Sequence, residues 1–285
     1  KCKYPLCRML YKCLFKITGK SQVWGMITGI RPVKEVNRLI SSGLSEKEIH
    51  SHLKEKYFIS DEKFSLAYKT AVTQEKLIKI PENSFSLYIS IPFCPTRCRY
   101  CSFVSHSMES AVKLIPDYIE KLCKEIEIIA EYAEKNGLSL DTIYFGGGTP
   151  TSLSADELNL IMKTVSCCFT ISKVREYTVE AGRADTITEE KLIAIKENGG
   201  RRISINPQTM NDNVLETIGR SHTAEQVREA FSLARKIGFD NINTDLIAGL
   251  PSDNYESFKN TLDEVISLDP ESITVHTLTL KRASS

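Results

Sequence analysis

The spacing of hydrophobic and polar residues divides the chain into two regions. Residues 1–84 carry apolar positions at helical spacing, separated by polar turns. Within them, SEKEIHSHLKEKY begins with a capping box formed by Ser45 and Glu48, and the next helical segment has Ser60 as its expected N-cap. Pro32, at the end of ITGIRP, suits the first turn of a further helix. We therefore expect a small, mainly helical N-terminal domain over residues 1–84.

Residues 85–285 instead alternate apolar runs with amphipathic segments. Two of the amphipathic segments begin with capping boxes, Ser154 with Glu157 and Thr223 with Gln226. The expected strands are the six apolar runs 86–93, 141–146, 177–181, 201–207, 242–250 and 272–280. Strands that alternate with helices pair in parallel through right-handed crossovers. Six such units are too few for a complete eight-stranded barrel. We therefore expect an α/β fold, either a partial (β/α)6 barrel or an open doubly wound sheet.

Unusual residues follow or interrupt most of these strands. Cysteines follow the first strand, GGGTPT follows the second, Glu180 lies in the third, Asn206 and Gln208 follow the fourth and Asp245 lies in the fifth. Both candidate architectures place their chemistry at the carboxyl ends of the strands. We therefore expect Cys94, Gly148, Glu180, Gln208 and Asp245 to lie on one edge of the sheet, around a common cavity.

Composition and charge exclude several classes of protein. The 285 residues are 41% hydrophobic and 26% charged, which is ordinary for a globular protein of one large domain or two. The net charge of +1 gives no general attraction to nucleic acid or to an anionic membrane. No apolar run reaches the ~18 residues of a membrane span, and no signal-peptide pattern opens the chain. We expect a cytoplasmic protein that binds no nucleic acid.

The nine cysteines do not suggest a disulfide framework, because their number is odd and no secretory leader precedes them. Three of them fall in helical segments, where we expect them to pack as small apolar side chains: Cys123, Cys167 and Cys168. Three more have a spacing that matches no compact metal site: Cys2, Cys7 and Cys13.

The remaining three cysteines, Cys94, Cys98 and Cys101, lie in one short loop with the spacing C-x-x-x-C-x-x-C. A structural zinc site needs four ligands, and a catalytic zinc with three protein ligands usually includes a histidine or a carboxylate. A [4Fe–4S] cluster held by three cysteines has one iron without a protein ligand. The spacing therefore favours a metal centre with an open position at which a small molecule binds.

A C-x-x-x-C-x-x-C loop after the first strand of a βα series resembles the radical S-adenosylmethionine (SAM) superfamily. This resemblance implies a partial or full (β/α) barrel, with a [4Fe–4S] cluster on the three cysteines. The amino and carboxylate groups of SAM would bind the fourth iron. Tyr100 fits the same pattern. YFGGGTPT matches the segment that contacts the methionyl amino group, through Gly147, Gly148 and Thr149.

Two carboxylates lie within apolar strands, where an ionised group is costly unless it is paired or faces a cavity. For Glu180 a ribose diol is a suitable partner, and a structural salt bridge to Arg183 or Arg202 is the alternative. The same two interpretations apply to Asp245. His222 could carry a proton or serve a structural role.

Further motifs resemble a narrower family, the oxygen-independent coproporphyrinogen dehydrogenases. They are FGGGTPT, VEAG, RISINPQ, L-x-x-I-G-R-x-H and DLIAGLP, and WGMITGIRPVK with VEAGRADTIT resembles the HemZ-type subgroup. The resemblance covers nearly the whole chain. It implies that SAM is contacted by Tyr88, Gly148, Thr149, Glu180, Gln208, Arg220 and Asp245. Thr279, on the sixth strand, is a weaker correspondence.

The family reaction converts propionate side chains of coproporphyrinogen III into vinyl groups, through a radical derived from SAM. An electron donor such as flavodoxin or ferredoxin is implied. Two features depart from the family: Phe103 stands where a further cysteine is usual, and the chain stops after the sixth strand, where a substrate-binding region would follow. The alternatives are a haem carrier of the same family, a radical enzyme with another substrate and, more distantly, a zinc module.

Overall fold

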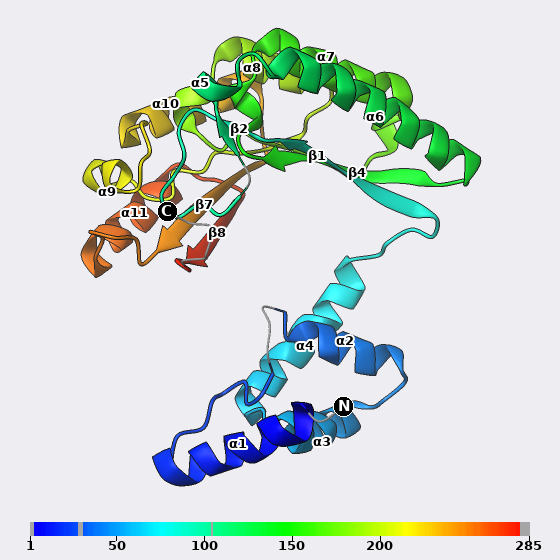
Figure 1. Ribbon diagram of the computed structural model, residues 1–285, viewed down its shortest axis with the longest axis vertical. Helices are drawn as coiled ribbons and strands as arrows, with labels where there is room; N and C mark the ends of the chain where they lie inside the picture. Colours follow the sequence, from blue (N-terminus) through cyan, green and yellow to red (C-terminus); the bar gives the residue numbers. More distant parts are fainter. Residues whose placement is uncertain (1–2, 28–30, 104, 280–285) are drawn as a thin grey trace. The chain divides into compact units, whose positions relative to one another are not determined.

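The computed structural model describes residues 3–27, 31–103 and 105–279. Contacts between residues divide the chain into two compact units, Lys1–Ile80 and Pro81–Ser285. The two units are coloured blue to cyan and cyan to red in Figure 1. The first strand, β1, begins at Ser84, shortly after this division.

The N-terminal unit is helical, as its hydrophobic spacing predicts. Its helices are α1 (Lys3–Thr18), α2 (Val33–Ser41), α3 (Glu46–Tyr57) and α4 (Asp61–Leu77). The expected capping box of Ser45 with Glu48 and the Ser60 N-cap are both present, and Pro32 directly precedes α2. Part of the TGIRP turn, residues 28–30, lies outside the described residues. Ile49 and Leu53 of α3 are fully buried in a separate small core.

The C-terminal unit is built on one parallel sheet. Within the described residues this sheet has six strands in the order β1-β4-β5-β6-β7-β8. The strands are β1 (Ser84–Ile91), β4 (Ser139–Gly147), β5 (Glu176–Glu180), β6 (Arg202–Ser204), β7 (Ile242–Ala248) and β8 (Ser272–Thr277). Every neighbouring pair is parallel. The six expected apolar runs therefore become the six strands of this sheet.

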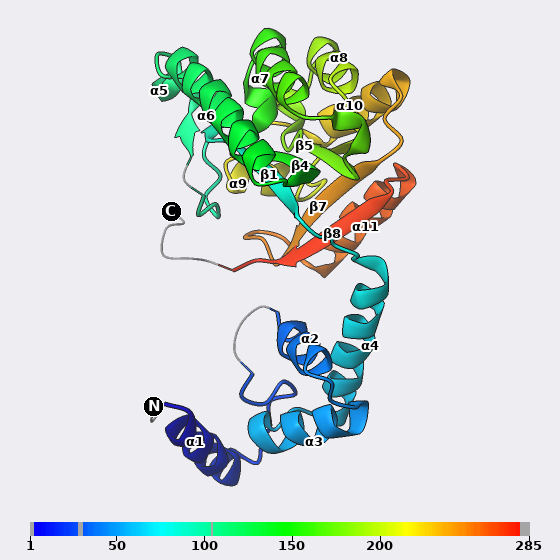
Figure 2. The same ribbon diagram turned by 90° about the vertical axis from the view of Figure 1, so that its right-hand side faces the viewer.

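Helices connect the strands and cover the convex side of the sheet (Figures 1 and 2). The long ones are α6 (Ile115–Lys135), α7 (Ala155–Cys168), α8 (Glu189–Glu197), α10 (Ala224–Ile237) and α11 (Tyr255–Ser267). The capping boxes predicted for α7 and α10 are both formed. Strands that follow one another in chain order around the sheet are typical of a barrel, whereas a doubly wound sheet reverses its order in the middle. The structure thus confirms a partial (β/α)6 barrel.

Short elements complete the unit. They are β2 (Phe93–Cys94), β3 (His106–Ser107), α5 (Met108–Ala111), η1 (Pro150–Ser152), η2 (Ile171–Lys173), η3 (Ala184–Thr186) and α9 (Asp212–Thr217). β2 and β3 pair in parallel, with Phe93 opposite His106 and Cys94 opposite Ser107. This small sheet, which the sequence did not predict, joins the two ends of the cysteine loop.

The helical cysteines are free thiols with different surroundings. Cys123 and Cys168 are partly buried and pack against the core of the C-terminal unit, as expected. The prediction for Cys167 is wrong, because this residue is exposed at the end of α7. Successive residues of a helix point in different directions, so Cys167 turns to solvent while Cys168 faces inward. Cys7 and Cys13 are exposed on α1, and Cys2 lies outside the described residues.

Candidate functional site

The cysteine loop is fixed to the rest of the unit by hydrogen bonds at several points. The Cys101 amide donates to the Cys98 carbonyl at 3.0 Å, which closes a turn within the loop. The Arg99 amide donates to the carbonyl of Ile218 at 3.0 Å, and the Thr96 hydroxyl donates to the carbonyl of Gly219 at 2.9 Å. The loop is therefore held against the segment that follows α9, more than a hundred residues along the chain.

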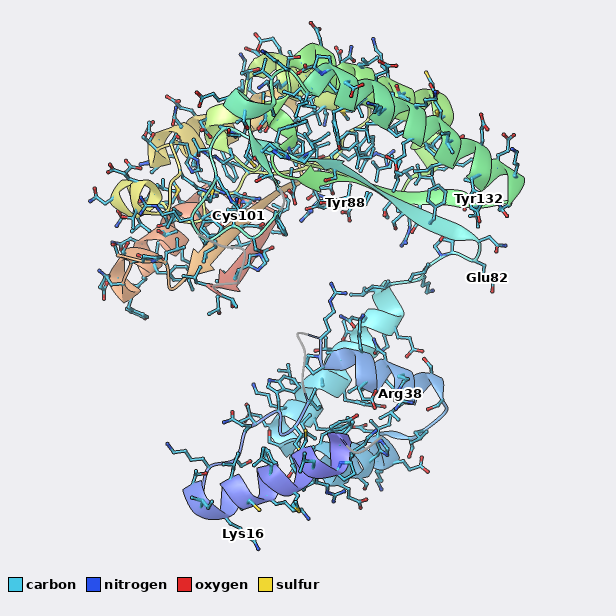
Figure 3. The ribbon with its side chains drawn as sticks, viewed as in Figure 1. Lys16, Arg38, Glu82, Tyr88, Cys101 and Tyr132 are labelled. Atoms are coloured by element: carbon cyan, nitrogen blue, oxygen red, sulfur yellow. The ribbon has the colours of Figure 1, made fainter. Side chains whose placement is uncertain are left out.

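One cavity at the carboxyl ends of the strands brings most of the expected site residues together. Its lining includes Cys94, Cys98, Tyr100, Cys101, Gly147, Gly148, Thr149, Glu180, Gln208, Arg220 and Asp245. Cys101, one of these lining residues, is labelled in Figure 3. Residues that sequence reasoning did not assign to the site also line the cavity: Thr96, Arg97, Phe103, Ser105, Gly182 and Arg183. Asn206, which the strand-end rule singles out after the fourth strand, lines the cavity as well.

Two of the expected residues lie outside this lining. In Figure 3 Tyr88 lies on the side of β1 away from α6. Its ring stacks on that of Tyr144, with centroids 5.9 Å apart, because the two residues are opposite one another on β1 and β4. Tyr144 donates a hydrogen bond to Glu180, which lines the cavity. Tyr88 is therefore connected to the cavity through the ring of Tyr144. Thr279 is exposed and bonds to the Thr277 carbonyl. Cofactor contacts of Tyr88 and Thr279 stay predictions.

Glu180, at the end of β5, accepts a hydrogen bond from the Tyr144 hydroxyl at 2.5 Å. Burial raises the pKa of Glu180, and the nearby Asp245 carboxylate raises it further, while the Tyr144 bond acts in the opposite direction. Within the described residues Glu180 forms no ion pair. Arg183 instead pairs with Asp185 at 3.2 Å, and Arg202 bonds to Ser272 at 3.5 Å. The structure thus favours the cavity-facing interpretation of Glu180 over the salt bridge.

Asp245 lies within β7, and Gln208 pairs with the next residue of that strand, Leu246. The Gln208 amide donates to the Asp245 carbonyl at 3.1 Å, and the Asp245 carboxylate accepts a bond from the side chain of Asn243 at 2.8 Å. Gln208 is buried and adopts a left-handed backbone, with φ of 70°. Such strain in a residue other than glycine is typical of functional sites, where the surrounding structure enforces it. Pairing with β7 therefore holds Gln208 at the cavity in one enforced conformation.

Arg220 brings a cation to the same cavity. Its Nη1 donates to the carbonyl of Asn206 at 2.6 Å and to that of Gly182 at 3.2 Å. Its Nε is buried and has no hydrogen-bond partner within the described residues. Beside it, burial raises the pKa of Tyr100 to about 12, which keeps the phenol protonated. A buried guanidinium with unused donor capacity suits a carboxylate ligand.

His222 is not among the described residues that line the cavity. It is 2% exposed, and burial is the main cause that lowers its pKa, which favours the neutral ring. Its Nδ1 lies 3.8 Å from Asp185, too far for a hydrogen bond. This position favours the structural interpretation of His222 over the proton carrier.

The chemistry of the three cysteines fits an iron–sulfur cluster. In the described part of the chain, no group of three or more histidine, cysteine or acidic side chains is arranged to hold one ion. Iron–sulfur clusters are held by cysteine thiolates. Cys94 also accepts a bond from the Thr149 hydroxyl at 3.6 Å, as a cluster thiolate can. The donor set therefore suits a [4Fe–4S] cluster.

Gly148 allows the GGGT segment to approach the cysteine loop. Its amide donates to the Ile91 carbonyl at 2.8 Å. A Cβ atom at this position would lie 2.6 Å from the Phe93 carbonyl oxygen and 2.9 Å from the Cys94 sulfur. Any side chain here would push the first cysteine out of place, so the absence of a Cβ is a requirement of this packing.

We expect Gly148→Ala to lower the iron and sulfide content of the reconstituted protein, because relieving the overlap must shift the backbone before Cys94. Overpacking of this kind costs about 1–3 kcal/mol, and sometimes more. Gly182→Ala is the matched control, since a Cβ there meets only the Asn206 side chain, at 3.5 Å. Iron and sulfide analysis provides the measurement. Equal iron content in both variants would show that this close approach does not matter for the cluster.

The chain matches the radical SAM superfamily over residues 88–265. It is 42% identical over 273 residues to the oxygen-independent coproporphyrinogen-III oxidase-like protein HemZ of Bacillus subtilis, which covers 94% of this chain and 54% of that protein. It is 39% identical over 194 residues to the haem chaperone HemW of the same organism, which covers 68% of this chain and 50% of HemW.

Among solved structures, the coproporphyrinogen III oxidase HemN of Escherichia coli, a radical SAM enzyme, superimposes with a TM-score of 0.62 at 28% identity. That alignment covers 75% of this chain and 51% of HemN. The chain thus spans about half the length of these relatives. The helices of the described residues include none that is long and apolar enough to cross a membrane. The family match over residues 88–265 agrees with the cysteine loop and the six-stranded parallel sheet, and the chain belongs to the radical SAM superfamily.

Proposed function

We propose that the protein is a radical SAM oxidoreductase that decarboxylates propionate side chains of coproporphyrinogen III to vinyl groups without oxygen, in porphyrin and haem biosynthesis. One observation supports coproporphyrinogen III as the substrate. The relative that aligns over both units, with 94% of this chain, is named as coproporphyrinogen-III oxidase-like. The HemW match, by comparison, covers 68% of the chain.

In this proposal Cys94, Cys98 and Cys101 each hold one iron of a [4Fe–4S] cluster, and SAM occupies the fourth. When bound, the cluster and SAM supply the one-electron chemistry that starts a radical reaction. The chain's own residues hold the cluster and SAM in fixed positions relative to one another. Glu180 accepts hydrogen bonds from the ribose, and Arg220 offers its buried guanidinium to the SAM carboxylate.

The other cavity residues complete the SAM site in this proposal. Gly147, Gly148 and Thr149 present backbone groups to the amino end of SAM, while Gln208 and Asp245 contact it from elsewhere in the cavity lining. Tyr100 covers the cluster beside the third cysteine. The proposal places the protein in the cytoplasm, where flavodoxin or ferredoxin would supply electrons. It assigns residues 85–285 to this catalytic core and residues 1–84 to a separate helical domain.

The second candidate is a haem-binding carrier that keeps the cluster fold without the dehydrogenase reaction. Two observations favour it. Relatives named as haem chaperones are up to 39% identical to this chain, and Phe103 occupies the position where the dehydrogenases have a further cysteine. Phe103 lines the cavity and is 64% exposed, so it contributes an apolar surface there and no metal ligand.

Anaerobic turnover separates the two candidates. The reconstituted full-length protein is mixed with SAM, a reductant and coproporphyrinogen III. The proposal expects 5′-deoxyadenosine together with a product that has lost carbon dioxide and gained vinyl groups. A stable haem-bound absorption spectrum without porphyrinogen turnover would support the carrier instead. Formation of 5′-deoxyadenosine only with a different substrate would retain the radical chemistry and reject the porphyrinogen.

A further inference from the structure

Arg183 is a buried cation in direct contact with the cysteine loop. It follows β5, in the segment VEAGRADT, and it is 2% exposed. Its Nη1 donates to the Thr96 carbonyl at 3.3 Å and to the Cys98 sulfur at 3.6 Å, while its Nη2 donates to the Thr96 hydroxyl at 3.0 Å. One guanidinium therefore contacts the backbone, a side chain and a thiol of the loop.

The opposite edge of the guanidinium is held by one carboxylate. Nε and Nη2 of Arg183 donate to the two oxygens of Asp185, each at 3.2 Å. A planar group held on one edge by two parallel bonds has little freedom to turn. Asp185 thus aims the remaining donor, Nη1, at Cys98, which is itself 8% exposed.

Burying a guanidinium is costly, and a single carboxylate partner is weak evidence of a net gain in stability. A cation in contact with a metal-ligating thiolate has another consequence. The potential of an iron–sulfur cluster depends on nearby charge, on hydrogen bonds to its sulfurs and on exposure to solvent. Reduction adds one negative charge, so a cation or an N–H donor at a ligand sulfur stabilises the reduced form.

We propose that Arg183 is a positioning residue for the cluster: it fixes Cys98 and Thr96 in place, and it raises the reduction potential through its bond to the Cys98 sulfur. Asp185 has the opposite electrostatic effect, because its negative charge offsets that of the guanidinium. This inference rests on the proposed function, since it requires the cluster to be bound by these cysteines.

Because Arg183 and Asp185 carry opposite charges, replacing one or the other should shift the reduction potential in opposite directions. The midpoint potential of the reconstituted full-length protein is measured by anaerobic redox titration, followed by electron paramagnetic resonance. We expect Arg183→Gln to lower the equilibrium constant for reduction about tenfold, which is 59 mV for a one-electron couple. We expect Asp185→Asn to raise the potential, because the guanidinium then acts without its counter-charge.

A matched control comes from another arginine–aspartate pair of the same unit. Arg175 donates through Nε and Nη2 to both oxygens of Asp141, at 2.5 Å. It directly precedes β5, at the opposite end of that strand from Glu180 and Arg183. We expect Arg175→Gln to leave the potential unchanged, although it removes an ion pair of the same kind.

Three outcomes would overturn the inference. They are an unchanged potential in Arg183→Gln, shifts of the same sign in Arg183→Gln and Asp185→Asn, and an equal shift in Arg175→Gln. If Arg183→Gln assembles no cluster, Asp185→Asn decides alone, and a potential that fails to rise rejects the proposal. A wild-type protein without a cluster would instead reject the proposed function.

Discussion

Replacing Cys94, Cys98 or Cys101 with alanine is expected to abolish the cluster. The wild-type protein, reconstituted anaerobically, should contain about four irons and four sulfides per chain, as one cubane requires. Each substitution removes the ligand of one iron, and SAM is expected to occupy the fourth. Iron and sulfide analysis, with the absorption of the reconstituted protein, measures the loss.

The matched controls are Cys123→Ala and Cys168→Ala. These thiols are partly buried against the core between α6 and α7, away from the cavity. Alanine leaves a small cavity there and should lower stability slightly while the iron content stays normal. The ligand assignment would be wrong if Cys123→Ala lost the cluster and Cys98→Ala kept it.

Glu180→Gln is expected to weaken SAM binding about tenfold or more, with the cluster intact. Hydrogen bonds to a charged group contribute roughly 1.5–3 kcal/mol, and about 1.4 kcal/mol corresponds to a factor of ten in affinity. Glutamine keeps the shape of the side chain and removes its charge. Titration of SAM into the reconstituted variant measures the affinity, and iron analysis checks the cluster.

The dependence on pH adds a second test of Glu180. Its pKa is raised by burial, so acidification protonates it earlier than an exposed glutamate. Wild-type affinity for SAM should therefore fall as the pH drops through this raised pKa, whereas the affinity of Glu180→Gln should show no such step. Tyr144→Phe is a useful companion variant, because it removes the bond that lowers this pKa. The step should then move to higher pH.

The stability of the protein without cofactor separates the two interpretations of Glu180. A raised pKa in the folded state means that the charged form opposes folding above the pKa of the unfolded chain, about 4.3. Glu180→Gln should therefore melt at the same or a higher temperature near neutral pH, with a gain that shrinks as the pH falls towards that value. A lower melting temperature with unchanged SAM affinity would establish the salt-bridge role instead.

Local signals in the sequence account for much of the fold. The capping boxes at Ser45, Ser154 and Thr223 form as predicted, because a cap involves residues only three positions apart. The six strands follow from their apolar runs for a similar reason, since strand and helix periodicities are read over a few residues. Cys167 marks the limit of such reasoning, because membership of a helix does not decide which face a residue occupies.

The sequence also indicated the chemistry, because the spacing of Cys94, Cys98 and Cys101 is itself local. The surroundings of these residues depended on the tertiary structure. The fold brings Tyr144 to Glu180 and Arg183 to Cys98, over separations of 36 and 85 residues.

The left-handed backbone of Gln208 is likewise enforced by its bonds to β7, and no pattern in RISINPQ signals it. Contacts between distant segments depend on how the strands are arranged in the sheet, and no local pattern encodes them. The sequence by itself thus determined the elements and the metal-binding loop of this protein. Only the tertiary structure decided which charged groups surround that loop.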